Sequence, residues 1–460
     1  MTDNTAEVVI CGAGIAGVAA AYELAVKRGV GDVVVVDDRP PLTLTSDKSS
    51  ECYRNWWPGP GSAMVDLMDR SVDLLEALAD ESDNYFHLNR RGYVYLTAVP
   101  DAVPAFQQAA EVVAALGGGD LRLHDGRAAA YQPAHPHDYH DQPGGADLLL
   151  GSELIRAQFP FVAPEAVAAL HVRRAGWLSA QQLGMYLWQR AREKGARLVS
   201  GRVTGVDAAH GRVQGVHIAV AGATETIAAP CFVNAAGPFL APVGRMLDVD
   251  LPVYNELHGK IAFEDTLGVI DRDAPMMIWN DAVRLPWSAD EVEFLAEQEN
   301  TRHLLAALPP GAHLRPEGGP GSQTLLMLWP YHTAVHNPPQ WPLHFDPEYP
   351  DVALRGLACL APGLAAYFER MSKPLVDGGY YTRTTENRPL VGPLPVDGAY
   401  VLGALSGFGI MAAPAAAELL AAHISGAALP DYAPAFALSR YDDPAYQRQL
   451  AGGDFDDGQL

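Results

Sequence analysis

The sequence is poor in positive charge, and lysine is especially scarce. Lysine and arginine together number 32 against 55 acidic residues, which gives a net charge of −23, and only five of the cations are lysines. Binding to nucleic acid or to an anionic membrane surface depends on clustered Lys and Arg side chains. We therefore predict no nucleic-acid partner. The acidic surface suits solubility, or a cationic or amine-bearing substrate.

Cysteine is also scarce, and its spacing carries no metal or disulfide signature. The four cysteines are Cys11, Cys52, Cys231 and Cys359, with no CxxC pair among them. Such spacing predicts isolated thiols in a reducing compartment. The histidines at 135, 137 and 140 lie in a polar, Gly-containing stretch without a fixed set of partner ligands. That stretch is more typical of a solvated loop than of a metal site, so we predict no metal.

Long hydrophobic runs are missing as well. No stretch reaches the roughly 18 uninterrupted apolar residues typical of a membrane-spanning helix. The residues before Val8 form neither a basic segment nor an apolar segment of the kind that opens a secretory signal. The sequence therefore predicts no membrane span and a cytoplasmic location.

The N-terminal segment carries a dinucleotide fingerprint. An apolar run, Val8–Cys11, leads into a GxGxxG turn at residues 12–17, and helical periodicity follows. A second apolar run at 33–36 ends on Asp37, where an acidic side chain can accept hydrogen bonds from ribose hydroxyls. The pattern predicts a βαβ unit that binds FAD or NAD. The residues expected to contact the cofactor are Gly12, Gly14, Ile15, Ala16, Gly17, Asp37, Asp38 and Arg39.

Three later segments resemble the D-amino-acid-oxidase-like family of FAD-dependent oxidoreductases. They are Phe232–Phe239, Gly379–Gly392 and Gly403–Pro414, and they occur in the order seen in that family, which includes glycine and sarcosine oxidases and dimethylglycine dehydrogenase. The resemblance implies FAD as the cofactor. It also implies that backbone amides of the last segment stabilise negative charge on the reduced flavin.

The same resemblance extends the set of cofactor-binding residues. Thr45–Ser50 is similar to the loop that passes the pyrophosphate and the edge of the flavin, and Val203 to the position beside adenine. The residues implied are Thr45, Ser46, Lys48, Ser49, Val203, Ala235, Gly237, Gly407, Phe408, Gly409, Ile410 and Met411. Gly379 falls near the position of the flavin-linking cysteine of sarcosine oxidases, so we expect FAD to be bound non-covalently.

We expect an α/β fold of two interleaved parts. The first is a Rossmann-type FAD-binding domain formed by residues 1–85, 175–250 and 375–460. The second is an α+β substrate domain built on a mixed or antiparallel sheet, formed by residues 86–174 and 251–374.

Departures from the family pattern affect the substrate site. Relatives that oxidise amino acids hold the substrate carboxylate with an Arg or Lys at positions where this chain has Tyr381 and Met411. Tyrosine offers one neutral donor in place of a bidentate cation, which puts binding of a simple α-amino acid in doubt. Arg54 or Arg383 could take the role, or each could be paired structurally.

Few protein groups are needed for the chemistry, because a flavin enzyme mainly orients its substrate. Strand alternation predicts that one of Tyr380 and Tyr381 faces the substrate. His258 and Lys260 share one strand face and could place a cation near the flavin, or could simply be an exposed pair. The candidate catalytic residues are Tyr381, Tyr380, Lys48, Lys260, His258 and Arg54.

We therefore expect an FAD-dependent oxidase or dehydrogenase that oxidises a C–N bond of an amine, a secondary amine or an N-substituted amino acid by hydride transfer to the flavin. The partners would be a small-molecule substrate and, as electron acceptor, oxygen or an electron-transfer protein. Two alternatives stay open: a flavin-binding subunit or scaffold that needs a partner, and oxidation of a substrate that is not an amine. The sequence does not separate oxidase from dehydrogenase.

Overall fold

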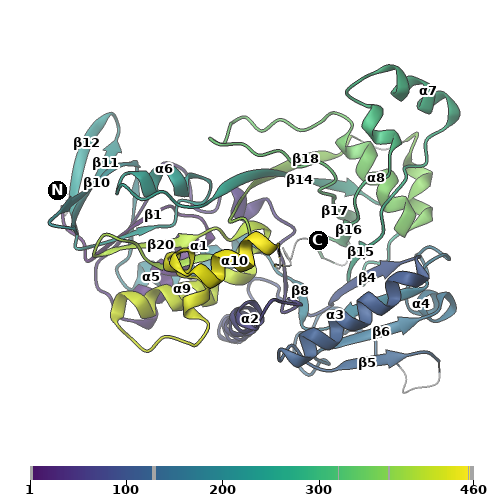
Figure 1. Ribbon diagram of the computed structural model, residues 1–460, viewed down its shortest axis with the longest axis horizontal. Helices are drawn as coiled ribbons and strands as arrows, with labels where there is room; N and C mark the ends of the chain where they lie inside the picture. The colour runs from purple at the N-terminus through teal and green to yellow at the C-terminus, as the bar shows by residue number, and fades with distance from the viewer. Residues whose placement is uncertain (1–3, 127–130, 320, 371–372, 454, 456–460) are drawn as a thin grey trace.

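The computed structural model describes residues 4–126, 131–319, 321–370, 373–453 and 455. Two large sheets dominate it, and they lie side by side in Figure 1. The long strands β14 (Tyr254–Glu264) and β18 (Leu375–Arg383) pair along nine residues and reach from one half of the molecule toward the other.

The first sheet contains the predicted βαβ unit. Its strand order is β19 (Leu390–Pro393), β20 (Ala399–Gly403), β13 (Cys231–Asn234), β1 (Val8–Cys11), β2 (Val33–Asp37) and β9 (Arg197–Ser200). Every pairing is parallel except that of β19 with β20. The strands β1 and β2 are buried on both faces, which explains their unbroken apolar sequence.

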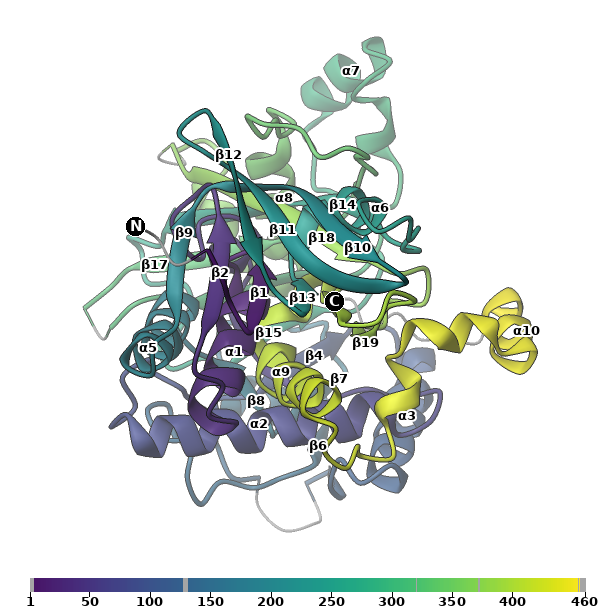
Figure 2. The ribbon, with the colours of Figure 1, turned by 90° about the vertical axis from the view of Figure 1, so that its left-hand side faces the viewer.

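Each face of this sheet has its own apolar core. Val8 and Ile10 pack with the helices α1 (Ile15–Tyr22), α2 (Ala63–Glu81), α5 (Ala180–Glu193) and α9 (Gly409–Ser425). Val9 and Cys11 pack on the other side, against α6 (Leu240–Arg245) and the meander β10 (Arg202–Ala209), β11 (Arg212–Val220) and β12 (Ala223–Ala228). Figure 2 shows the meander in front of the sheet and α1, α9 and α2 below it.

The second sheet has nine strands and mixed direction. Its order is β18, β14, β17 (Thr324–Leu328), β16 (Ala312–Pro316), β15 (Met276–Trp279), β4 (Tyr93–Thr97), β7 (Ala168–Val172), β6 (Ala146–Leu150) and β5 (Leu121–His124). The pairs β15/β4 and β5/β6 are parallel and the rest antiparallel. The α/β architecture with a mixed second sheet is thus confirmed. The strand β18, which begins at residue 375, lies at the edge of this sheet.

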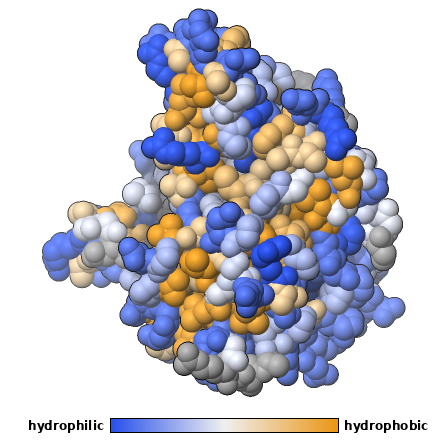
Figure 3. Space-filling view, turned by 90° about the vertical axis from the view of Figure 1, so that its right-hand side faces the viewer, coloured by the Kyte–Doolittle hydropathy of each residue, from blue (hydrophilic) through white to orange (hydrophobic). Residues whose placement is uncertain are grey.

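Helices cover the second sheet, and smaller elements link the halves. These helices are α3 (Val103–Ala115), α4 (Ser152–Gln158) and α8 (Tyr349–Leu360), whereas α7 (Ala289–Glu297) projects at the upper right of Figure 1. The ribbon β3 (Cys52–Arg54) with β8 (Ala175–Trp177) connects the two parts, and α10 (Pro444–Gly452) projects from the body in Figure 2. In Figure 3 the face at the end of the second sheet shows apolar patches broken up by hydrophilic side chains.

One helical stretch is apolar enough to be compared with a membrane span. Among the described residues only Ser406–Ser425 has the necessary length and composition, and 72% of it is buried inside the protein. Such burial is typical of a core helix. In this fold α9 packs against α1 and α2.

Candidate active site

A long cavity of about 380 Å³ runs along the carboxyl ends of the parallel strands in the first sheet. This edge is where doubly wound sheets bind nucleotides. The predicted cofactor residues that line it are Gly12, Gly14, Ile15, Ala16, Asp37, Asp38, Arg39, Thr45, Ser46, Ser49, Val203, Ala235, Gly237, Gly407 and Gly409. Segments from the start, the middle and the C-terminal part of the chain thus meet at one cavity.

The glycine turn is shaped by close backbone contacts. A Cβ on Gly12 would lie 2.4 Å from the Ala235 carbonyl oxygen, and its φ is +110°. A Cβ on Gly17 would lie within 2 Å of the Gly12 carbonyl oxygen, which explains why Gly17 packs the helix on the turn and does not line the cavity. Gly14 lines the cavity where α1 begins, and Ser46 Oγ accepts a hydrogen bond from the Ile15 amide at 2.9 Å.

Asp37 is fixed at the end of β2. Its carboxylate accepts hydrogen bonds from the amides of Ala13 (2.7 Å) and Arg39 (2.9 Å). Burial raises the pKa of the carboxyl, and these two hydrogen bonds oppose that rise. The side chain is thereby held at the cavity wall with lone pairs left to accept ribose hydroxyls.

A second helix start also lines the long cavity. Gly407 and Gly409 line it where the turn at 406–408 becomes α9. The starts of α1 and α9 are neighbours, because a Cβ on Gly409 would lie 3.8 Å from Ile15 Cγ2, and both helix starts border the cavity. This donor set suits a pyrophosphate and a ring that becomes anionic when reduced, so the residues present fit FAD.

An inner chamber of about 50 Å³ adjoins the long cavity. Tyr381 and Gly407 line both spaces, so the chamber meets the cavity at its α9 end. The remaining lining residues are Ser50, Cys52, Arg54, Tyr93, His258, Gly259, His313, Leu328, Trp329, Pro330, Phe408 and Met411. None of these described lining residues is an Asp or a Glu.

Arg54 is held in the chamber wall by aromatic rings. Its guanidinium carbon lies 4.9 Å from the Trp57 ring centre and 5.6 Å from that of Tyr93, and the side chain is 5% exposed. Cation–π contacts of this kind stabilise a buried guanidinium, and Arg54 Nε also donates to the Trp56 carbonyl oxygen at 3.4 Å.

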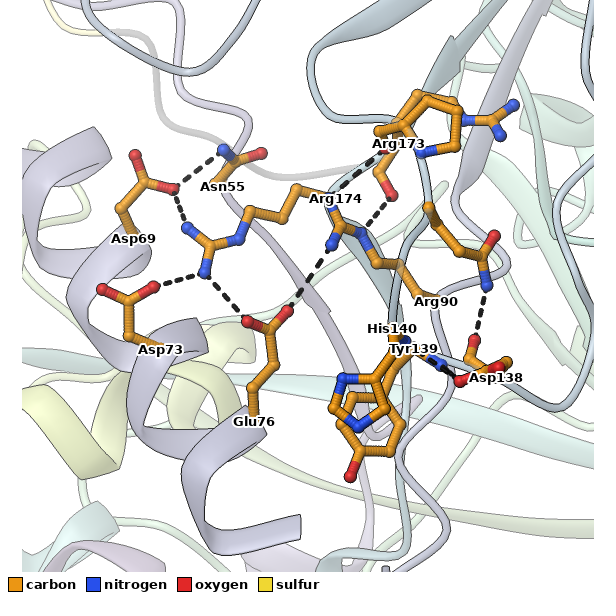
Figure 4. Close-up of polar contacts among 12 residues, drawn as sticks. Asn55, Asp69, Asp73, Glu76, Arg90, Asp138, Tyr139, His140, Arg173 and Arg174 are labelled. Carbon is orange, nitrogen blue, oxygen red and sulfur yellow. Dashed lines mark hydrogen bonds and ion pairs between the residues drawn. The ribbon is translucent and has the colours of Figure 1, made fainter. Parts of the chain in front are cut away.

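A polar network fixes the backbone next to Arg54, as Figure 4 shows. The Asn55 amide nitrogen donates to the Arg174 carbonyl, and the Asn55 side chain donates to Asp69 at 2.9 Å. The Arg174 guanidinium in turn binds three acids spaced along α2, which are Asp69, Asp73 and Glu76. The ribbon carrying Arg54 is thus tied to a long helix.

His258 and Arg383 share one acid. His258 stacks on Tyr381 at 4.1 Å between ring centres, and its Nε2 lies 3.4 Å from Glu256. Arg383 donates to the same carboxylate at 2.7 Å. Burial lowers the pKa of His258, against the opposing effect of Glu256, so the imidazole is neutral near pH 7. Of the two arginines considered from sequence, Arg383 is engaged by Glu256, whereas Arg54 lines the chamber.

Lys48 belongs to the Thr45–Ser50 loop and Lys260 to β14, and neither lines the long cavity or the inner chamber. Lys48 forms ion pairs with Asp47 (3.1 Å) and Asp377 (2.7 Å). Lys260 donates to the carbonyls of Asp47 and Ser49, both at 3.2 Å. Burial lowers the pKa of Lys260. In this arrangement both lysines brace the loop.

The two tyrosines of β18 lie differently in the site. Tyr380 and Tyr381 both line the long cavity, and Tyr381 alone also lines the chamber. The Tyr380 hydroxyl is instead hydrogen-bonded to the backbone of Gln340 at 2.9 Å. Phe408 and Met411 line the chamber instead of the long cavity, and Ile410 lines neither.

Several lining residues escaped the sequence analysis. They are Phe239, Pro242, Val243 and Met246 in the long cavity, and Cys52, Tyr93, His313 and Leu328 in the chamber. Apart from Phe239, which ends a segment of family resemblance, they carry no local motif. Among the described residues there is also no group of three or more His, Cys, Asp or Glu side chains arranged to hold a metal.

A dinucleotide-sized cavity at the edge of the parallel sheet, with a smaller chamber beside it, is typical of a dinucleotide-dependent oxidoreductase. The model of the family described as FAD dependent oxidoreductase (DAO) matches residues 7–423. The chain belongs to this family, and FAD is its cofactor. No sequence among curated proteins matches the chain.

Solved structures share the whole fold. The L-proline dehydrogenase of P. horikoshii aligns with a TM-score of 0.72 at 20% identity, over 95% of this chain and 98% of that one. The glycine oxidase of Geobacillus kaustophilus gives 0.71 at 17%, over 95% and 99%. The L-amino acid deaminase of Proteus vulgaris gives 0.66 at 17%, over 95% and 97%. At these identities the likeness concerns the fold.

Gly379 leads to a direct prediction about the cofactor linkage. The residue has no side chain to bond to flavin, and an added Cβ would lie 3.1 Å from the Thr45 Cα. We expect acid precipitation of the purified protein to release all of the yellow chromophore into the supernatant, where it is measured by absorbance. Flavin retained in the washed pellet would contradict non-covalent binding and would require a linkage at another residue.

Proposed function

We propose that the enzyme oxidises the C–N bond of a small amine that carries a carboxylate, such as an N-substituted amino acid, with the carboxylate bound by Arg54. The observation that carries this proposal is the position of the Arg54 guanidinium in a chamber that opens onto the flavin end of the long cavity. The volume of about 50 Å³ favours a small substrate.

The charge distribution of the chamber supports this proposal. A carboxylate matches the parallel N–H donors of a guanidinium, so Arg54 in the chamber lining suits a carboxylate-bearing substrate. The two lining imidazoles add no charge near pH 7, because burial lowers the pKa of both His258 and His313. A substrate with one carboxylate is compatible with a chamber whose described lining residues include a guanidinium and no Asp or Glu.

The names of structurally similar enzymes support the same substrate class. They include proline dehydrogenase, glycine oxidase, L-amino acid deaminase and iminodiacetate oxidase, whose named substrates all contain nitrogen and a carboxylate. The missing cation at Met411 does not argue against this class, since Arg54 lines the same chamber.

Each part of the chain has a defined task in this reaction. The flavin, when bound, supplies an acceptor for the hydride from the carbon beside nitrogen. Arg54 orients the carboxylate, and the aromatic rings of Tyr381, Phe408 and Trp329 exclude water around the reacting carbon. Tyr381 lies at the junction of the two spaces and sets the face presented to the flavin.

An anaerobic reduction screen tests the proposal. Purified enzyme is mixed with N-methylglycine, L-proline, N-methyl-L-alanine, and the matched amines that lack a carboxylate, and bleaching of the visible flavin bands is recorded. We expect at least one of the amino acids, and none of the carboxylate-free amines at equal concentration, to reduce the flavin. Reduction by the carboxylate-free amines alone would overturn the role of Arg54. Readmitting air and then an artificial dye would show which type of acceptor restores the oxidised spectrum.

A further inference from the structure

His313 lies in the chamber wall with a defined orientation. It is on β16, where alternation places Ala312 and Leu314 in the apolar core of the second sheet and turns His313 and Arg315 to the opposite face. That face looks toward the Thr45–Ser50 loop, because Arg315 Nε donates to the Ser50 carbonyl at 2.8 Å. His313 therefore points toward the flavin end of the site.

The protonation state of the His313 ring is fixed by its backbone contact. Nδ1 lies 2.7 Å from the Gly311 carbonyl oxygen, which can only accept a hydrogen bond. Nδ1 must therefore carry the proton, and Nε2 is left as an acceptor on a ring that lines the chamber. Burial lowers the pKa of His313 to about 4, with Arg54 adding to the effect, so the ring does not gain a second proton near pH 7.

The chamber thus combines the Arg54 cation with a neutral acceptor, His313 Nε2, whose tautomer is fixed. Arg54 can bind an anionic group, but it cannot accept a hydrogen bond from an amine, because a guanidinium has donors only. No acid lines the chamber among its described residues, so an ammonium ion would find no counter-charge there. A neutral amine that donates one N–H bond fits this set of groups.

We propose that His313 Nε2 accepts a hydrogen bond from the N–H of the neutral substrate amine, which selects primary and secondary amines over tertiary amines and ethers. This inference rests on the proposed function and narrows its substrates to carboxylate-bearing amines that keep an N–H group. A tertiary amine or an ether bound in the same pose would leave Nε2 without its donor. The cost of one lost neutral hydrogen bond corresponds to about tenfold in affinity.

The test uses amines and their oxygen isosteres. The probes are N-methylglycine with methoxyacetate, and L-proline with tetrahydrofuran-2-carboxylate, so that each pair differs only by N–H against O. Affinities come from the concentration dependence of anaerobic reduction for the amines and from perturbation of the flavin spectrum for the ethers. Each amine value is corrected for the fraction that is deprotonated. We expect the wild-type enzyme to prefer the amine by about tenfold.

Two variants separate the acceptor role from a structural role. His313→Gln places an amide oxygen near the position of Nε2, whereas His313→Asn keeps a donor for the Gly311 carbonyl but removes the acceptor from the chamber. We expect the Gln variant to keep the preference for amines and the Asn variant to lose it. FAD content and Tm of both are measured first.

The outcomes distinguish this inference from the proposed function. A preference that survives in the Asn variant but not in the Gln variant would show a structural role for His313 and overturn the inference. A wild-type enzyme that binds amines and ethers equally well would overturn it without any variant, and the proposed function would stand. If none of the four probes reduces the flavin or perturbs its spectrum, both the proposed function and the inference fall.

Discussion

Arg54→Gln is expected to lower kcat/KM for any amino acid that reduces the wild-type flavin by roughly 10² to 10³. The variant keeps a polar side chain but leaves the substrate carboxylate buried without a charged partner, which costs about 2–5 kcal/mol. The loss should appear mainly in KM if the carboxylate contact is equal in the ground state and the transition state. Anaerobic stopped-flow reduction at several substrate concentrations measures both quantities.

The control for this substitution is Arg212→Gln. Arg212 lies on β11 of the meander, its side chain is 66% exposed, and it pairs with Asp397. The substitution Arg212→Gln removes the same charge from the molecule, so unspecific electrostatic effects would appear equally in both variants. Equal kinetics for Arg54→Gln and wild type, with FAD fully bound, would remove Arg54 from the substrate site. A carboxylate-free amine, if it reacts at all, should be unaffected by either change.

Gly12→Ala is expected to raise the FAD dissociation constant by roughly 100-fold or more, or to give apoprotein. The added Cβ would lie 2.4 Å from the Ala235 carbonyl oxygen, and φ of +110° is unfavourable for any residue with a Cβ. Strain of this kind costs about 1–3 kcal/mol even before the contact is relieved. Because relief requires the turn to move away from β13, the pyrophosphate site itself is displaced. Titration of apoprotein with FAD, followed by flavin fluorescence, gives the constant directly.

Gly29→Ala provides a matched comparison. Gly29 also has positive φ, +71°, but a Cβ there would meet nothing within 4 Å. This variant should lose about 1 kcal/mol of stability from backbone strain and keep wild-type affinity for FAD. If both variants bound FAD equally well, the turn at residues 12–17 would not be the pyrophosphate site.

The cofactor-binding half was predictable because its signal is local. The residues from Val8 to Asp37 contain a strand, a glycine turn, a helix and an acid at fixed spacings, and each spacing has one physical explanation. The fold class followed from this unit together with the family resemblance of later segments. The confirmed mixed sheet could be anticipated only through that resemblance, since its strands are scattered along the chain.

The substrate chamber was less predictable because it exists only in three dimensions. Arg54 could be singled out as a cation near an aromatic segment, but its proximity to His313 depends on how β3 and β16 are brought together. His313 itself has no neighbouring motif, so its position in the chamber can be recognised only from the folded sheet. For Lys48 and Lys260 the sequence suggested a catalytic role because of their charge. In the structure Lys48 pairs with acids and Lys260 donates to loop carbonyls.

The long cavity is assembled from residues between Cys11 and Gly409. During synthesis, the turn that opens it emerges first, yet the second helix start follows almost four hundred residues later. At about 5–20 residues per second, the ribosome needs roughly 20 to 80 seconds to supply both helix starts. The complete lining of the flavin site is therefore available only after most of the chain has been translated.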